Sequence, residues 1–182
     1  GSWLTLPRRN FWPALGNHDW NGAGGLNPYH KFFHLPRYYD TDLDDHHLIH
    51  LYVLDSDPRE PDGTGWDSAQ AKWFREAYER NRFKSCFHVV TFHHPGVSTK
   101  IDTSGYCEGC EPVGEMDWKF GEMGIDVVFA GHAHWGERYI HRGINYFTVG
   151  NATDDLDVGG FARDGRSKFL SLIHISEPTR PE

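Results

Sequence analysis

The chain has few cysteines, fewer methionines and no long apolar run. Its 182 residues include three cysteines and two methionines. Three cysteines are too few for a domain held together by disulfides, so the fold must rely on an apolar core. The longest apolar runs fall far short of the roughly 20 residues of a membrane-spanning helix, and the first residues lack a signal-peptide pattern. These absences predict a globular protein without a membrane partner.

Positive charge is also scarce. The chain has 18 lysines and arginines against 26 aspartates and glutamates, which gives a formal net charge of −8. Faces that bind nucleic acid carry clusters of lysine and arginine, and this sequence shows no such cluster. The sequence therefore predicts that nucleic acid is not a partner.

The three cysteines fall in two different contexts. Cys107 and Cys110 form a single CxxC pair in a glycine-rich stretch. One such pair without a second is compatible with a local disulfide, with two free thiols or with a metal role. Cys86 lies in an apolar run, which predicts a buried and unreactive thiol.

What is present suits a globular α/β domain. Apolar residues make up 38% of the chain and aromatic residues 15%, which is more than a disordered chain contains. A chain of this length can bury about 70% of its unfolded surface in one core. We expect one domain over residues 1–170. Residues 171–182 resemble translated sequencing-adapter sequence, and we expect them to be non-native or disordered.

The expected strands and helices follow from periodicity and from turn residues. Strands are predicted over residues 11–15, 47–54, 86–92, 125–130, 138–141 and 144–149. Helices are predicted over residues 27–33, 67–82 and 115–123, the second capped by Asp67 or Ser68. Residues 96–112 predict a long functional loop. The alternation of strands and helices predicts an α/β fold.

Three short motifs carry side chains that bind metals. They are Gly16-Asn17-His18-Asp19, His93-His94-Pro95 and Gly131-His132-Ala133-His134. Each follows an apolar run that predicts a strand, and the ends of strands gather ligand-binding loops in α/β sheets. Imidazole, amide and carboxylate groups together suit a divalent metal ion. The sequence therefore predicts a metal site built from these motifs.

The order of these motifs resembles that in the calcineurin-like metallophosphoesterases. The surrounding sequence resembles their purple-acid-phosphatase-like and bacterial alkaline-phosphatase-like branch. The resemblance extends over residues 7–151, and it is carried by residues 11–20, 37–40, 52–57, 91–95 and 131–138. It implies a four-layer αββα sandwich. We expect the chain to be a partial domain of this type that lacks the first strands.

The resemblance also implies roles for individual residues. Asn17, His93 and His132 would bind one metal ion and His134 a second, the ions being Fe, Zn, Mn or Mg. His18 would be the catalytic imidazole, held by Asp19. The implied reaction is hydrolysis of small phosphomonoesters by a hydroxide activated between two metal ions. An extracytoplasmic location is implied as well.

The four implied ligands are all neutral. Two divalent ions about 4 Å apart repel each other by on the order of 20 kcal/mol at an effective dielectric constant of 20, so such a pair needs carboxylate ligands. The family supplies them in an Asp-x-His string and a Gly-Asp turn, and neither occurs before Asn17. We therefore expect this chain to hold half of a binuclear site. Gly136 also stands where purple acid phosphatases carry tyrosine.

Other interpretations stay open at this point. A phosphodiesterase or nucleotidase would share the fold, and an inactive fragment would bind at most one metal ion weakly. His94 could line the site or pack beneath a loop, while Asn17 and Asp19 could be turn residues. Asp55 and Asp57 are interpreted as turn residues at the end of a strand. The remaining histidines His46, His47, His50, His88 and His141 are expected to be structural or exposed.

Overall fold

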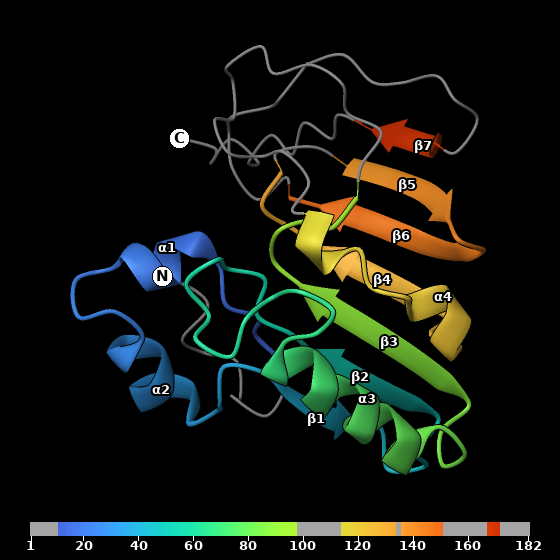
Figure 1. The fold of residues 1–182 in the computed structure, drawn as a ribbon, viewed down its shortest axis with the longest axis horizontal. Helices are drawn as coiled ribbons and strands as arrows, with labels where there is room; N and C mark the ends of the chain where they lie inside the picture. Colours follow the sequence, from blue (N-terminus) through green and yellow to red (C-terminus); the bar gives the residue numbers. More distant parts are fainter. Residues whose placement is uncertain (1–10, 98–113, 134–135, 151–166, 172–182) are drawn as a thin grey trace, which may run out of the picture.

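The computed structural model describes residues 11–97, 114–133, 136–150 and 167–171. Its strands form one seven-stranded sheet in the order β1-β2-β3-β4-β6-β5-β7 (Figure 1). The strands are β1 (Tyr39–Asp42), β2 (Ile49–Val53), β3 (Phe87–Phe92), β4 (Val127–Ala130), β5 (Gly136–His141), β6 (Ile144–Val149) and β7 (Ser167–Ser171). The helices are α1 (Asn17–Asn21), α2 (Asn27–Phe33), α3 (Ala69–Asn81), the 3-10 turn η3 (Gly114–Met116) and α4 (Phe120–Met123).

The centre of the sheet is parallel. Strands β2, β3, β4 and β6 pair in parallel, whereas β1 is antiparallel to β2 and β5 is antiparallel to β6 and β7. The carboxyl ends of the parallel strands therefore lie along one edge, where α/β sheets gather ligand-binding loops. Helix α1 lies beyond that edge (Figure 1).

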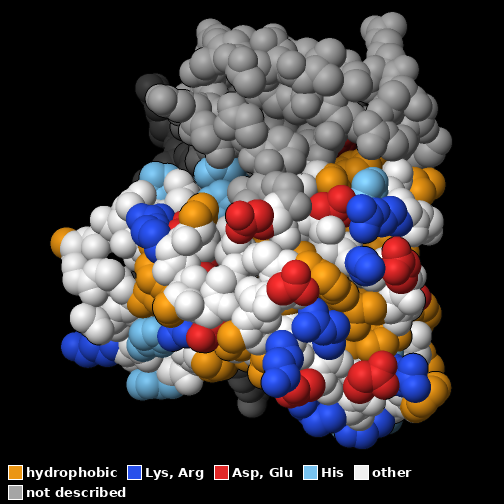
Figure 2. Space-filling model, viewed as in Figure 1, with side chains coloured by type: hydrophobic (Ala, Val, Ile, Leu, Met, Phe, Trp, Pro, Cys, Tyr) orange, Lys and Arg blue, Asp and Glu red, His pale blue; other side chains and the backbone are white. Residues whose placement is uncertain are grey.

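Helix α3 covers one face of the sheet with an apolar stripe. The Ser68 side chain caps its first turn by accepting a hydrogen bond from the Ala71 backbone N–H. Ala71, Phe74 and Ala77 are buried at the spacing of one helix face. They pack in a cluster with residues of β2, β3, β4 and α4 that contains Trp118. Figure 2 shows charged side chains of both signs over the outward surface on this side of the molecule.

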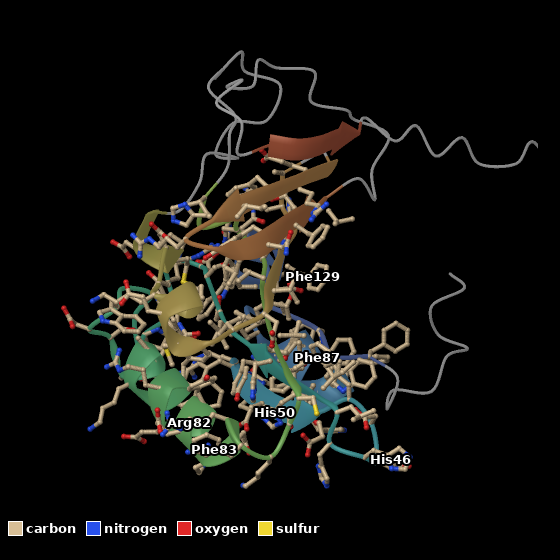
Figure 3. All side chains as sticks on the ribbon, turned by 90° about the vertical axis from the view of Figure 1, so that its right-hand side faces the viewer. His46, His50, Arg82, Phe83, Phe87 and Phe129 are labelled. Atoms are coloured by element: carbon tan, nitrogen blue, oxygen red, sulfur yellow. The ribbon has the colours of Figure 1, made fainter. Side chains whose placement is uncertain are left out.

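The opposite face of the sheet is less covered by the described residues. A small cluster of Tyr39, Leu51 and Val53 packs there. Phe87 and Phe129 project from the same face with exposed fractions of 55% and 39%. Figure 3 shows both rings on the side of the sheet away from α3 and α4. The main core therefore lies between the sheet and α3.

Most predicted elements are confirmed. Helix α2 has the predicted bounds, β2, β3, β4, β5 and β6 fall within two residues of the predicted strands, and Ser68 is the cap of α3. The predicted α/β class is confirmed, and the described residues supply one sheet and its helices. Most of the predicted loop 96–112, together with Cys107 and Cys110, lies outside the described residues, as does the tail beyond Ser171.

Three of these predictions differ from the structure. Residues 11–15 are not a strand, and Pro13 in their middle has no N–H to donate to a ladder. Residues 115–123 do not form one helix, because buried Trp118 separates η3 from α4 and donates its indole N–H to the Thr64 carbonyl. Cys86 is exposed, since it precedes β3. The sequence also did not predict α1, β1 and β7, and in β1 two aspartates in four residues lower strand propensity. None of the described helices is long and apolar enough to span a membrane.

Those two aspartates of β1 hold a buried histidine of β2. His50 Nε2 lies 2.9 Å from Asp40 Oδ2, and His50 Nδ1 lies 2.7 Å from Asp42 Oδ1. Carboxylates accept at both ring nitrogens, so the arrangement suits the doubly protonated imidazolium. Burial lowers the pKa of His50, but these hydrogen bonds outweigh burial and raise it above its ordinary value. His50 lies on β2, next to the edge strand β1, and is labelled in Figure 3.

This pair predicts a pH-dependent effect of Asp40→Asn on stability. A histidine whose pKa is raised by folding stabilises the fold below its unfolded pKa and loses that contribution as pH rises through the folded value. The free energy of unfolding should therefore fall by about 1–3 kcal/mol in the variant at pH 6, and by less at pH 9. Urea unfolding at both pH values measures the change.

Asp45→Asn is the control for this measurement, because it removes the same charge from an exposed position nearby. It should change stability little at either pH. A loss for Asp40→Asn that is equal at pH 6 and pH 9 would contradict the imidazolium assignment.

Candidate metal centre

The three motifs converge at the carboxyl edge of the parallel strands. His93 and His94 follow β3, and Gly131, His132 and Ala133 follow β4, the parallel neighbour of β3. The Gly131 backbone N–H donates to the His93 carbonyl at 2.9 Å, which continues the pairing past the strand ends. Asn17 begins α1 at the same edge. Three segments far apart in the sequence thus meet at one point.

Three side chains from these segments are in direct contact. His93 Nε2 lies 3.1 Å from Asn17 Oδ1 and 3.0 Å from His132 Nδ1. Two ligand atoms bound to one tetrahedral ion at 2.0–2.1 Å lie about 3.3 Å apart. The observed separations are therefore close to those of ligands on a common metal ion. The residues present fit a metal that takes nitrogen and oxygen ligands.

His94 belongs to the same group of imidazoles. Ligand atoms of His93, His94 and His132 all lie within 4.8 Å of one another. The rings of His94 and His132 pack with their centroids 4.4 Å apart. Ser56 Oγ accepts the His94 backbone N–H at 2.8 Å and lies 2.9 Å from His94 Nδ1. His94 thus lines the site, and its ring orientation is set by the segment that follows β2.

The two motif glycines leave different amounts of room for His93. A Cβ atom at Gly16 would lie 2.9 Å from His93 Cε1, whereas a Cβ atom at Gly131 would lie 3.7 Å from His93 Nδ1. The first distance is a steric overlap and the second is ordinary contact. The approach of α1 to His93 therefore depends on glycine at position 16.

The backbone at His132 is strained. His132 has a φ of 61°, in the left-handed region that non-glycine residues rarely adopt. The Ala133 backbone N–H bonds to the Gly131 carbonyl at 2.6 Å, which closes the tight turn around it. Strain of this kind costs roughly 1–3 kcal/mol and is concentrated at functional sites. The strained residue, His132, carries the imidazole that contacts His93.

His93 and His94 are neutral near pH 7. Burial and the neighbouring His94, His132 and His18 lower the pKa of His93 to about 3. Burial, followed by His132, lowers the pKa of His94 to about 4. A neutral imidazole keeps the lone pair with which histidine binds metals. His93 and His94 are therefore in the protonation state that a metal ion needs.

The remaining predicted residues have different positions. His18 is exposed on the first turn of α1. Asp19 Oδ2 accepts the Gly16 backbone N–H at 2.9 Å, so Asp19 caps α1. No hydrogen bond joins Asp19 to His18 within the described part of the chain, because adjacent residues on a helix do not face each other. His134 lies outside the described residues.

Sequence reasoning missed one segment that borders the site. Asp55, Ser56 and Asp57 are fully buried after β2, and Arg59 follows them. Asp55 and Asp57 were interpreted as turn residues, yet full burial of two carboxylates is unusual for a turn. Burial, together with nearby Glu60, raises the pKa of Asp55 to about 7 despite the hydrogen bonds from the Asp57 N–H and Trp20. The signal in the sequence was two carboxylates and an arginine directly after a buried strand.

Solved structures resemble this chain in fold. A purple acid phosphatase from yellow lupin (Lupinus luteus) seeds matches with a TM-score of 0.60 and 18% identity, over 90% of this chain and 33% of its own length. The GAP50 protein of Plasmodium, the anchor in the inner membrane complex, matches with a TM-score of 0.51 and 15% identity, over 87% of this chain and 54% of its own length. The chain thus spans about a third and about half of these two proteins. No curated protein matches it in sequence.

The family is shown by its sequence model. The model of the calcineurin-like phosphoesterases matches residues 3–136, which include Asn17, His93, His132 and the strands that position them. The match covers well over half of the chain, and the fold of the lupin phosphatase agrees with it. This chain therefore belongs to the calcineurin-like phosphoesterase family.

Proposed function

We propose that this chain contributes to a metal-dependent phosphatase that hydrolyses small phosphomonoesters. The observation that carries the proposal is the contact of Asn17 Oδ1 and His132 Nδ1 with the same atom, His93 Nε2, at 3.1 and 3.0 Å. Membership of a family of phosphoesterases supports hydrolysis of a phosphate ester. The purple acid phosphatase fold supports a phosphomonoester as the substrate.

Each residue has a part in this proposal. Asn17, His93 and His132 would hold one metal ion, and His134 would contribute to a second. All four ligands are neutral, so a pair of ions would need carboxylate ligands in addition to them. When bound, the ions would activate water and polarise the phosphoryl oxygens as Lewis acids. The set accepts Fe, Zn, Mn or Mg.

His18 would handle the proton in this reaction. It is exposed and directly follows Asn17 on α1, so it borders the metal centre without being buried in it. A protonated imidazole can donate to the alkoxide leaving group of a phosphomonoester. Asp19 supports this role by capping the helix that carries His18.

Substitution of the two motif glycines tests whether metal affinity depends on the close approach of Gly16 to His93. Gly16→Ala should lower the affinity of the chain for Zn²⁺ by about 10–100-fold, because the new methyl group displaces the His93 ring. Gly131→Ala is the matched control, since its methyl group would meet only ordinary contacts. Titration calorimetry measures both affinities. Equal affinities in the two variants would contradict the site.

The reaction is tested through His18. His18→Ala should lower kcat for p-nitrophenyl phosphate by roughly 10²–10⁴-fold in the longest natural protein that contains this sequence, loaded with Zn²⁺, Mn²⁺ or Fe. The control is His46→Ala, an exposed histidine between β1 and β2, labelled in Figure 3. Unchanged turnover in His18→Ala, or no turnover with any metal, would refute the proposal. Faster cleavage of bis(p-nitrophenyl) phosphate than of p-nitrophenyl phosphate would indicate that the substrate is a phosphodiester instead of a phosphomonoester.

A further inference from the structure

The segment that follows β2 contacts α1 through two of its residues, Asp55 and Arg59. The indole Nε1 of Trp20 donates to Asp55 Oδ2 at 3.0 Å. Arg59 Nη2 donates to the Asn17 carbonyl oxygen at 3.1 Å, and Arg59 Nη1 donates to the Asn21 side chain. These contacts bracket α1, from its first residue to its last.

Arg59 is itself fixed by a buried carboxylate. Its Nε and Nη2 donate to the two oxygens of Asp57, each at 2.7 Å. The Arg59 backbone N–H adds a bond of 2.9 Å to Asp57 Oδ1. The Asp57 side chain is only 1% exposed. A guanidinium held at two atoms by a planar carboxylate has little rotational freedom, so the donors that reach α1 are preset.

The segment is also anchored to the core. Buried Gln70 of α3 accepts the Asp55 backbone N–H at 2.7 Å and donates to the Asp55 carbonyl at 2.9 Å. The Asp57 N–H then bonds to Asp55 Oδ1 at 2.9 Å. A continuous series of hydrogen bonds therefore runs from α3, through Asp55 and Asp57, to Arg59 and α1.

Helix α1 needs such support. It has five residues and buries none of them, and helices this short are unstable on their own in water. Asn17 nevertheless has to present its side chain to His93. Its carbonyl oxygen bonds to Arg59 while its side-chain oxygen contacts His93 Nε2. Arg59 thus fixes the backbone from which Asn17 reaches the metal centre.

We propose that Arg59 is a positioning residue, which holds α1 so that Asn17 Oδ1 meets His93 and His132. Its role at the metal rests on the proposed function, whereas its hold on α1 does not. Four of the five N–H groups of an arginine are engaged by Asp57, Asn17 and Asn21. Arg59 therefore acts on the site through α1, with few donors left for a substrate.

The test compares three variants of the full 182-residue chain. Arg59→Ala removes every contact of the guanidinium. Arg59→Lys keeps a positive charge near Asp57 but lacks the fork that joins Asp57 to Asn17. Arg75→Ala is the matched control, because Arg75, like Arg59, donates to a backbone carbonyl, here that of Trp66. Among the described residues, the polar contacts of Arg75 are with Trp66 and not with α1.

Two readouts are taken for each variant. Amide hydrogen exchange in the metal-free chain should accelerate at least tenfold at Asp19 and Trp20 in both Arg59 variants and stay unchanged in Arg75→Ala. Affinity for Co²⁺, followed by its visible absorption, should fall roughly tenfold in both Arg59 variants, as when partners that orient metal ligands are removed. Arg75→Ala should bind Co²⁺ as the unmodified chain does.

The outcomes separate the two proposals. Unchanged exchange in Arg59→Ala overturns the hold of Arg59 on α1. Faster exchange with unchanged Co²⁺ affinity overturns its role at the metal. Wild-type Co²⁺ affinity in Arg59→Lys overturns the role of the guanidinium fork, because a positive charge near Asp57 would then be sufficient for metal binding. If the unmodified chain binds no Co²⁺, the proposed function fails and the role at the metal fails with it. The exchange measurement then still decides whether Arg59 holds α1.

Discussion

The parallel pairing of β3 with β4 is the constraint on which the candidate site depends. Phe92 pairs with Ala130 at the ends of these strands, and the bond from the Gly131 N–H to the His93 carbonyl extends the ladder by one step. The next residues on each strand therefore emerge side by side. This register brings His93 Nε2 to 3.0 Å from His132 Nδ1.

The site is built from two parts that are held in different ways. His93, His94 and His132 follow directly from paired strands, and Ser56 holds His94. Asn17 and His18 lie on a short helix that buries no residue and is held mainly by hydrogen bonds. Elements with few buried apolar contacts open at low free-energy cost. The candidate site therefore joins residues that follow directly from the sheet to a short helix that side-chain contacts keep in place.

The sequence predicted the scaffold better than the details of the site. The apolar patterns of β3 and β4 were sufficient, because they agree with the packing of these strands. The motifs also indicated that Asn17, His93 and His132 meet. It could not show the αL backbone of His132, the cap formed by Asp19, or the contacts of Arg59, since these depend on side chains brought together by tertiary structure. The broken helix at Trp118 has the same cause, because burial of one large ring outweighed local propensity.

The central claim is that Asn17, His93 and His132, from three separate segments, form one metal centre. X-ray absorption at the zinc edge of the Zn²⁺-loaded chain tests it most directly. The account predicts one bound ion per chain coordinated by nitrogen and oxygen atoms at about 2.0–2.1 Å, with the outer-shell scattering of at least two imidazoles. A spectrum without imidazole scattering, or with sulfur at about 2.3 Å, would contradict it.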